Sequence, residues 1–138
     1  MTERITERKG PCVRIYDEID WDRPLETGDP STRPPRALVE QAQKTGARRK
    51  KLVQGEGGFY MNRSVLPPGF RVPPHQHNHH EMLVILRGGC DFDDGLASLS
   101  ADDTIVIDAN TRYGFTCGPQ GMEFLTIRTG ESRTSLSE

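Results

Sequence analysis

Short apolar runs separated by turn residues fill the chain from residue 58 onward and limit the folds open to it. The runs are rich in Val, Ile, Phe and Tyr, which favour β-strands. Between them the segment DFDDGLAS predicts a hairpin, because Asp94 and Gly95 readily supply the positive φ angles of a tight turn. This alternation of short apolar runs and turns is typical of a β-sandwich or β-barrel. The sequence therefore predicts an all-β domain with strands in GFYMNRSVL, EMLVIL, TIVIDA, YGFTC and MEFLTIR.

Residues 1–55 differ from the rest of the chain because they are charged and contain half of its prolines. Their apolar cluster CVRIYDEIDW predicts an extended arm that packs on a neighbouring surface. The segment PRALVEQAQKTGARRKK predicts a short, marginal helix between Pro35 and Gly46, and its RRKK run indicates a solubilising surface. We predict an extended, partly ordered N-terminal segment over 1–55, a barrel over 56–132 and a tail over 133–138.

Composition excludes several classes of protein. The 138 residues suit one domain, and 18 Lys and Arg against 20 Asp and Glu give no sign of general nucleic-acid or membrane-surface binding. No apolar run approaches the roughly 20 residues of a membrane span, and the start, MTERITERKG, lacks the apolar stretch of a signal peptide. Three cysteines without paired spacing predict no disulfide framework, so we expect a soluble, cytoplasmic protein.

All four histidines stand in the six residues HQHNHH, and Glu81 follows at once. Side chains alternate in an extended segment, so His75 and His77 project to the same side. A chain reversal would bring the Glu81 carboxylate to the same point. Two imidazoles and a carboxylate suit a divalent first-row metal that must also bind substrate or oxygen. His79 and His80 are expected in the intervening loop, outside this centre.

The spacing of these residues resembles the first signature motif of the cupin superfamily. Gly69, five residues, His75, one residue, His77, three residues, Glu81, six residues and Gly88 match it in full. The resemblance implies a double-stranded β-helix, that is, a jelly-roll barrel, with a metal inside one end and room for one small ligand. It also implies that the two histidines and the glutamate are metal ligands, while the glycines serve turns.

The second cupin motif keeps its spacing but not its residue types. The best alignment places Asp102, Asp108, Asn110, Tyr113 and Cys117 at its positions. Asn110 can adopt a left-handed conformation in place of glycine, whereas the fourth metal ligand, usually histidine, is replaced by Tyr113. Either the tyrosine stays outside the metal's inner shell and hydrogen-bonds substrate or acts as an acid, or it binds the metal as a phenolate. Cys117 is expected to be a small buried side chain.

These observations predict a metal-binding cupin, namely a small-molecule enzyme in which Tyr113 is catalytic. Iron(II) is the first choice of metal, because two histidines and a carboxylate resemble the centre of non-haem oxygenases. A dioxygenase is therefore the leading hypothesis. With manganese, nickel or zinc the same site would suit an isomerase, decarboxylase or lyase that uses no oxygen, and a non-enzymatic ligand-binding cupin is a third possibility.

The expected partners are a small organic substrate and a second copy of the chain. The family resemblance implies a homodimer, and the arm from Val13 to Trp21 is the candidate for exchange between its subunits. Neither nucleic acid nor a membrane is expected. Arg128, at the end of the last predicted strand, is a possible contact for a substrate carboxylate but is not counted among the predicted site residues.

Overall fold

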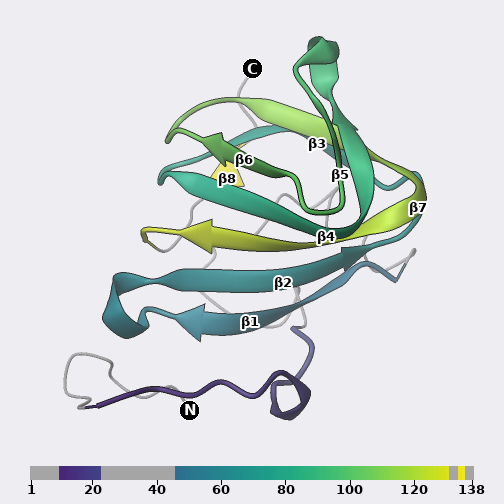
Figure 1. Ribbon diagram of the computed structural model, residues 1–138. Coiled ribbons are helices and arrows are strands. Elements are labelled where there is room, and N and C mark those ends of the chain that lie inside the picture. The colour runs from purple at the N-terminus through teal and green to yellow at the C-terminus, as the bar shows by residue number, and fades with distance from the viewer. Residues whose placement is uncertain (1–9, 23–45, 131–133, 136–138) are drawn as a thin grey trace.

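The computed structural model describes residues 10–22, 46–130 and 134–135, and strands make up nearly all of its regular structure (Figure 1). Three short 3-10 turns accompany them, η2 (Tyr16–Glu18), η4 (Glu56–Gly58) and η5 (Asp93–Gly95). No helix in the described part of the chain is long and apolar enough to cross a membrane. The strands are β1 (Arg48–Gln54), β2 (Tyr60–Leu66), β3 (Arg71–His77), β4 (Glu81–Phe92), β5 (Ser98–Ser100), β6 (Thr104–Ile107), β7 (Tyr113–Arg128) and β8 (Thr134–Ser135).

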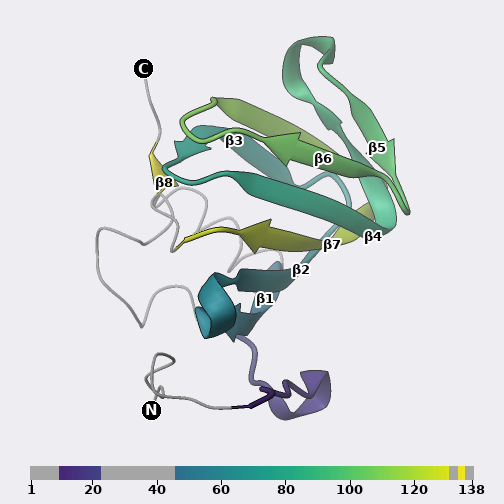
Figure 2. The same cartoon turned by 60° about the vertical axis from the view of Figure 1, so that its left-hand side comes forward.

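The two longest strands, β4 and β7, run antiparallel and form the centre of the sheet. On its other edge β4 pairs with β6 near its start and with β5 near its end. The first residues of β7 pair with β3 and its last residues with β2, while β1 and β8 lie at the two ends of the strand order. Figures 1 and 2 show these strands curving around one interior, which confirms the predicted all-β jelly-roll barrel.

The β4–β7 pair bends where two glycine backbones meet. Gly88 and Gly121 have φ angles of 73° and 72°, and the pairing register shifts on both sides of Gly88. A Cβ atom on Gly88 would lie 2.0 Å from the carbonyl oxygen of Gly121. Both the positive φ and the close approach therefore require glycine. Gly69 also has a positive φ, 71°, as a glycine serving a turn should.

The apolar core fills the middle of the barrel. Leu83 and Ile85 are its most completely buried side chains, and they alternate along β4 with residues that face outward. Three phenylalanines add ring contacts: Phe92 and Phe115 lie 5.2 Å apart between centroids, and Phe115 meets Phe124 edge-on at 6.3 Å. Polar side chains are buried where β4 begins, and the core separates this end of the barrel from the β4–β5 hairpin.

Some predicted boundaries differ from the observed strands. YGFTC and MEFLTIR were expected as separate strands but belong to the single strand β7, because Gly118 and Pro119 lie at a bend rather than at a break. The sheet also extends beyond the predicted barrel range 56–132, through β1 at one end and β8 at the other. The predicted hairpin is confirmed, with φ angles of 60° at Asp94 and 70° at Gly95.

The RRKK run is part of strand β1 and does not form the predicted solubilising surface. Lys50 is only 6% exposed, because its ammonium lies 3.8 Å from the ring centroid of Tyr16 and donates to that residue's carbonyl oxygen at 2.8 Å. Arg48 stacks over Trp21 at 4.3 Å. Cation–π contacts thus attach residues 10–22 to the sheet, and this cover could not be foreseen from the charges alone. The predicted helix between residues 35 and 46 falls almost entirely outside the described residues.

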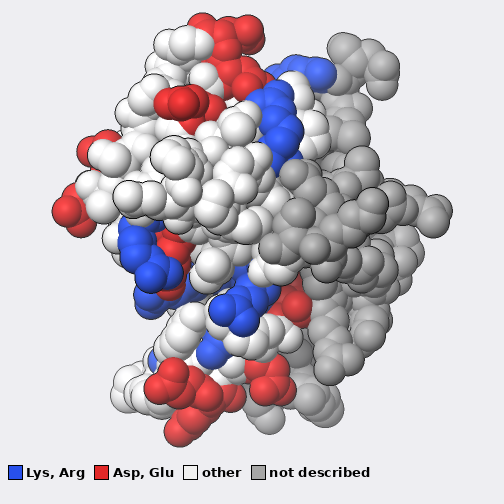
Figure 3. All heavy atoms as spheres, turned by 90° about the vertical axis from the view of Figure 1, so that its right-hand side faces the viewer, with Lys and Arg blue, Asp and Glu red and all other residues white. Residues whose placement is uncertain are grey.

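Charged side chains of both signs are interspersed on the face shown in Figure 3. Ion pairs across three strands also lie on the outside of the sheet. Glu123 of β7 accepts from Arg63 of β2 at 2.7 Å and from Arg87 of β4 at 2.5 Å. The outer surface is therefore locally balanced in charge, in keeping with a net charge of −2 for the whole chain.

A bidentate ion pair ties β3 to the turn after β4. The two Nη atoms of Arg71 donate to the two carboxylate oxygens of Asp93 at 2.5 and 2.7 Å, and Nη1 also reaches Thr116 Oγ1 at 3.2 Å. These hydrogen bonds from Arg71 lower the pKa of Asp93 below its usual value. The contact joins β3, β7 and the η5 turn at the end of the barrel opposite the buried histidines.

We expect Asp93→Asn to lower the free energy of unfolding at pH 7 by about 1 kcal/mol, as for a well-oriented surface ion pair. Because the pKa of Asp93 is lowered in the folded state, the pair's contribution is present above the unfolded value of about 3.8 and is lost as the pH falls through the folded value. Urea unfolding at pH 7 and at about pH 3 measures this. The difference in unfolding free energy between the wild type and Asp93→Asn should be smaller at pH 3 than at pH 7. Asp91→Asn is the control. An equal effect at both pH values would contradict the assignment.

Candidate active site

Strand β3 presents His75 and His77 to the interior of the barrel. The preceding pair Pro73 and Pro74 offers no N–H groups to the ladder, and the register between β3 and β7 shifts at this point. Beyond it His75 pairs with Tyr113, and the two histidine rings lie 4.8 Å apart between centroids in a T-shaped contact. The prediction that both imidazoles project to one side therefore agrees with the structure.

One ring nitrogen of His75 is fixed by the backbone. Nδ1 lies 2.8 Å from the carbonyl oxygen of Pro73, and since a carbonyl only accepts, Nδ1 carries the proton and Nε2 is left as an acceptor. Burial lowers the pKa of His75, and burial lowers that of His77 to about 4. Both rings are therefore neutral near pH 7, the form in which imidazole binds a metal.

Glu81, the first residue of β4, is a buried carboxylate with both oxygens engaged. It is 3% exposed. The Tyr113 hydroxyl donates to Oε1 at 2.5 Å, and Arg128 Nε donates to Oε2 at 2.9 Å. Burial opposes ionisation of this group, but the nearby His77 and Arg128 together with the Tyr113 hydrogen bond outweigh it and lower the pKa of Glu81. The carboxylate is ionised, and its charge is balanced by Arg128.

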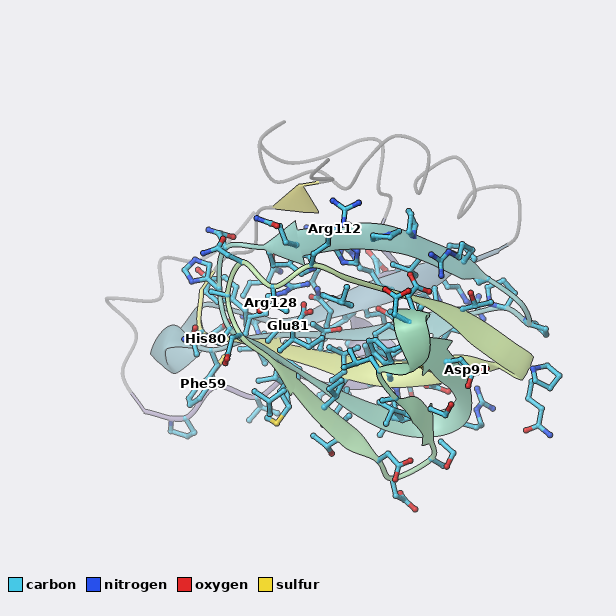
Figure 4. All side chains as sticks on the ribbon, turned by 90° about the horizontal axis from the view of Figure 1, so that it is seen from above. Phe59, His80, Glu81, Asp91, Arg112 and Arg128 are labelled. Carbon is cyan, nitrogen blue, oxygen red and sulfur yellow. The ribbon has the colours of Figure 1, made fainter. Side chains whose placement is uncertain are left out.

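The two partners of Glu81 come from opposite ends of one strand. Tyr113 begins β7 and Arg128 ends it. Arg128 lies directly opposite Glu81 in the β4–β7 ladder, whereas Tyr113 reaches the site from beside His75 on β3. Figure 4 shows Glu81 and Arg128 close together within the barrel, with His80 at the same end and Asp91 at the other. The curvature of β7 therefore assembles the site.

Tyr113 is held as a protonated phenol. Burial, the charge of Glu81 and the hydrogen bond to it all raise the pKa of Tyr113 well above its usual value. Its ring packs at 4.5 Å from His75 and stacks on Phe115 at 6.5 Å. The side chain therefore fills the barrel as an aromatic residue and also presents a hydroxyl group to the carboxylate.

The donor atoms fit a divalent metal in type, although Glu81 is already engaged. His77 Nε2 lies 3.7 Å from Glu81 Oε2, close to the roughly 3.4 Å that separates two ligand atoms sharing a tetrahedral ion at about 2.1 Å each. Within residues 10–22, 46–130 and 134–135, however, no group of three or more His, Cys, Asp or Glu side chains is arranged to hold a metal. The metal site therefore stays a prediction, with Arg128 as the competitor for the carboxylate.

The other two histidines lie in the loop between β3 and β4, as predicted. His80 is exposed, and its Nδ1 accepts from the backbone N–H of Ala109 at 3.0 Å. The ring of His79 lies against Gly130, where a Cβ atom would come within 2.4 Å of it. These contacts join the loop to neighbouring backbone segments and do not bring either ring to Glu81.

The two barrel cysteines are buried, which agrees with the prediction for Cys117, and neither is in a disulfide. Cys90 of β4 and Cys117 of β7 lie opposite each other in the ladder. Burial raises the pKa of Cys90 to about 11 and that of Cys117 to about 12. Both thiols therefore stay protonated near pH 7 and serve as small apolar side chains.

Arg128 is the site residue that the sequence interpretation did not commit to. The signal was present in MEFLTIR: Phe124, Thr126 and Arg128 share one face of the strand, and the first two are buried. A cation on a buried face requires a partner. Identifying Glu81 as that partner needs the β4–β7 register, and the sequence does not contain it.

Two histidines, a glutamate and a tyrosine thus lie together at one end of a jelly-roll β-barrel. A family model described as a cupin domain matches residues 62–128. The chain belongs to the cupin superfamily. The resemblance drawn from the first motif is therefore confirmed.

Several solved structures share this fold. The polyketide cyclase RemF from Streptomyces resistomycificus has a TM-score of 0.60 and 20% identity, covering 95% of this chain and 89% of its own. KdgF from Halomonas sp. has a TM-score of 0.60 and 18% identity, covering 87% and 94%. A predicted oxalate decarboxylase from Thermotoga maritima has a TM-score of 0.52 and 25% identity, covering 59% and 78%. No curated protein matches the chain.

We expect Tyr113→Phe to lower the free energy of unfolding by about 1–3 kcal/mol, because it leaves a buried, charged acceptor without its donor. Thermal unfolding of the metal-free protein measures the change. Tyr60→Phe is the matched control, since the Tyr60 hydroxyl has no hydrogen-bond partner among the described residues, and it should cost no more than about 0.5 kcal/mol. Equal losses for the two variants would show that the short hydrogen bond contributes nothing.

Proposed function

We propose that this cupin is an enzyme acting on a small organic molecule, with its reaction centre at His75, His77, Glu81 and Tyr113. The observation that carries the proposal is the carboxyl group of Glu81, buried at the end of the barrel with the Tyr113 hydroxyl hydrogen-bonded to it. Such a group is costly to bury. An enclosed carboxylate, a phenol and two neutral imidazoles supply the groups that proton transfer requires.

We also propose that His75, His77 and Glu81 bind a divalent metal ion. Iron(II) is the favoured ion, and manganese, nickel and zinc are the alternatives. The neutral imidazoles and the unprotonated Nε2 of His75 support this, since both are the forms that ligation requires. Bound there, the ion would act as a Lewis acid toward a coordinated substrate oxygen.

Tyr113 is proposed as the proton donor. Its hydroxyl donates to Glu81 Oε1, so the proton lies between the phenol oxygen and the carboxylate. This arrangement supports the first role considered for the residue, a hydrogen-bond donor or acid outside the inner metal shell. The phenolate alternative would require Tyr113 to lose both its proton and its bond to Glu81.

Two reaction classes follow, and they differ in whether oxygen is consumed. The two-histidine, one-carboxylate set is the reason for proposing a non-haem iron dioxygenase. The Tyr113–Glu81–Arg128 network instead favours proton transfer without oxidation, as in an isomerase, decarboxylase or lyase. A polyketide cyclase and a predicted oxalate decarboxylase among the similar folds accord with the second class, which we regard as the better supported by the geometry.

Elemental analysis of protein purified without an affinity tag tests the metal site. We expect about one divalent ion per chain in the wild type and its loss in His77→Ala, because one of three ligands is removed. His80→Ala is the matched control, since that ring is exposed and lies in the loop, and it should keep the metal. Equal metal content in all three proteins would place the ion elsewhere.

Turnover of a panel of small organic acids separates the reaction classes. Proton NMR detects any product, and an oxygen electrode run in parallel detects oxidation. We expect product without oxygen uptake, and about a 10²–10⁴-fold lower kcat in Tyr113→Phe if the phenol is the proton donor. Oxygen uptake in step with product would favour the dioxygenase, and saturable binding with no product would favour the non-enzymatic ligand-binding cupin.

We further propose a homodimer formed through the N-terminal segment. Tyr16 and Trp21 pack on the cations of β1, whereas Val13 and Ile15 are 72% and 48% exposed. Exposed apolar side chains on a docked arm suit a second copy of the chain. The free cysteines suit a reducing compartment, so a cytoplasmic location is proposed as well.

Light scattering tests the role of this arm. We expect the wild type to have the mass of two chains and Val13→Ser/Ile15→Ser to shift toward the mass of one, because the apolar contact is removed. Leu96→Ser is the control, as Leu96 is 63% exposed but lies in the distant β4–β5 turn. An unchanged mass in the double variant would remove the arm from the interface.

A further inference from the structure

The guanidinium group of Arg128 has hydrogen-bonding capacity that the protein does not use. Nε donates to Glu81 Oε2 at 2.9 Å, and the side chain is 13% exposed. Within the described ranges neither Nη1 nor Nη2 has a hydrogen-bond partner. No described side-chain nitrogen or oxygen is both enclosed and unpaired, so these two nitrogens keep some contact with solvent.

The position of this group is fixed from both sides. Arg128 lies opposite Glu81 on one neighbouring strand and opposite Tyr60 on the other. It shares the inward face of β7 with Phe124 and Thr126, which are buried. Because Glu81 anchors Nε, the plane of the guanidinium is set before any ligand arrives, and a pre-oriented fork loses less freedom on binding.

A second cation near the site is already neutralised. Arg49 of β1 acts on His77 electrostatically, but its Nε donates to Asp22 at 2.9 Å. Arg49 is thus paired away from Glu81, whereas Arg128 contacts Glu81 directly and its Nη groups are open to a ligand there. The Nη1–Nη2 edge of a guanidinium binds the two oxygens of a carboxylate side by side.

We propose that Arg128 is a substrate-binding residue, whose Nη1 and Nη2 bind the carboxylate of a small organic acid while Nε holds Glu81. The inference rests on the proposed function, because it takes the His75, His77 and Glu81 centre as the substrate site. A single arginine whose charge is already balanced by Glu81 suits no more than a monoanion, whereas a phosphate dianion would need more positive charge. The substrate class is thus a monocarboxylate held beside the Tyr113 hydroxyl.

Saturation-transfer NMR on metal-free, full-length protein tests the subsite with benzoate and its neutral isostere benzamide. We expect benzoate to bind at least about tenfold more tightly than benzamide, as for one charge-assisted pair of hydrogen bonds. Arg128→Gln should abolish this preference. Arg63→Gln is the matched control and should keep it, because Arg63 also pairs with a buried glutamate but on the outside of the sheet. Inorganic phosphate, run in parallel, should bind more weakly than benzoate.

Two further variants separate direct contact from repulsion by an uncompensated Glu81. In Glu81→Gln the charge of Arg128 is no longer balanced, so benzoate should bind several-fold more tightly than to the wild type. In the double variant Glu81→Gln/Arg128→Gln the preference for benzoate should be absent, although no carboxylate remains to repel it. A preference that persists in the double variant, or no preference in the wild type, would overturn the proposal.

Circular dichroism checks that every variant is folded. If Arg128→Gln is unfolded, Arg128→Lys replaces it in the binding experiment. Lysine keeps the charge but lacks the fork, so we expect it to retain a weaker preference; a preference as strong as that of the wild type would overturn the role of the two Nη atoms. Because the readout is binding without metal and without turnover, failure here leaves the metal and turnover experiments to judge the proposed function separately.

Discussion

The buried carboxylate of Glu81 is the constraint around which the barrel end is organised. An ionised group at 3% exposure must be compensated within the protein, and the compensation comes from a cation on one side and a phenol on the other. Both partners belong to β7, and they stand at its two ends. Strand β7 must curve around the interior to bring both of its ends to Glu81. The curvature that closes the barrel therefore also provides the partners of the buried carboxylate.

Contacts away from Glu81 hold the surrounding strands in place. The aromatic core from Phe92 to Phe124 holds β4 and β7 together behind the site, and the Arg71–Asp93 pair closes the far end. Residues 10–22 cover β1 through cation–π contacts and place Asp22 on Arg49. Apart from the Phe115–Phe124 contact within β7, these contacts join segments that are far apart in the sequence.

The sequence was informative where local chemistry sets the structure. Strand texture, the Asp94–Gly95 turn and the alternation of His75 and His77 depend on neighbours in the chain, and all three appear as predicted. It was uninformative where pairing between distant segments decides. The burial of Lys50 depends on Tyr16 and Trp21, and the role of Arg128 depends on its register with Glu81. Neither relation has a signature in spacing or composition.

The approach of Gly88 to Gly121 carries a consequence of a different kind. Even a methyl group on Gly88 would overlap the opposing carbonyl oxygen, and one on Gly121 would fall 2.4 Å from that of Leu66. The sheet can fold over itself here only because neither residue has a side chain. The clashing atoms belong to the backbone, so repacking of surrounding side chains could not make room for a larger residue. This backbone crossing lies between the end of the barrel that holds Glu81 and the end that carries the β4–β5 hairpin.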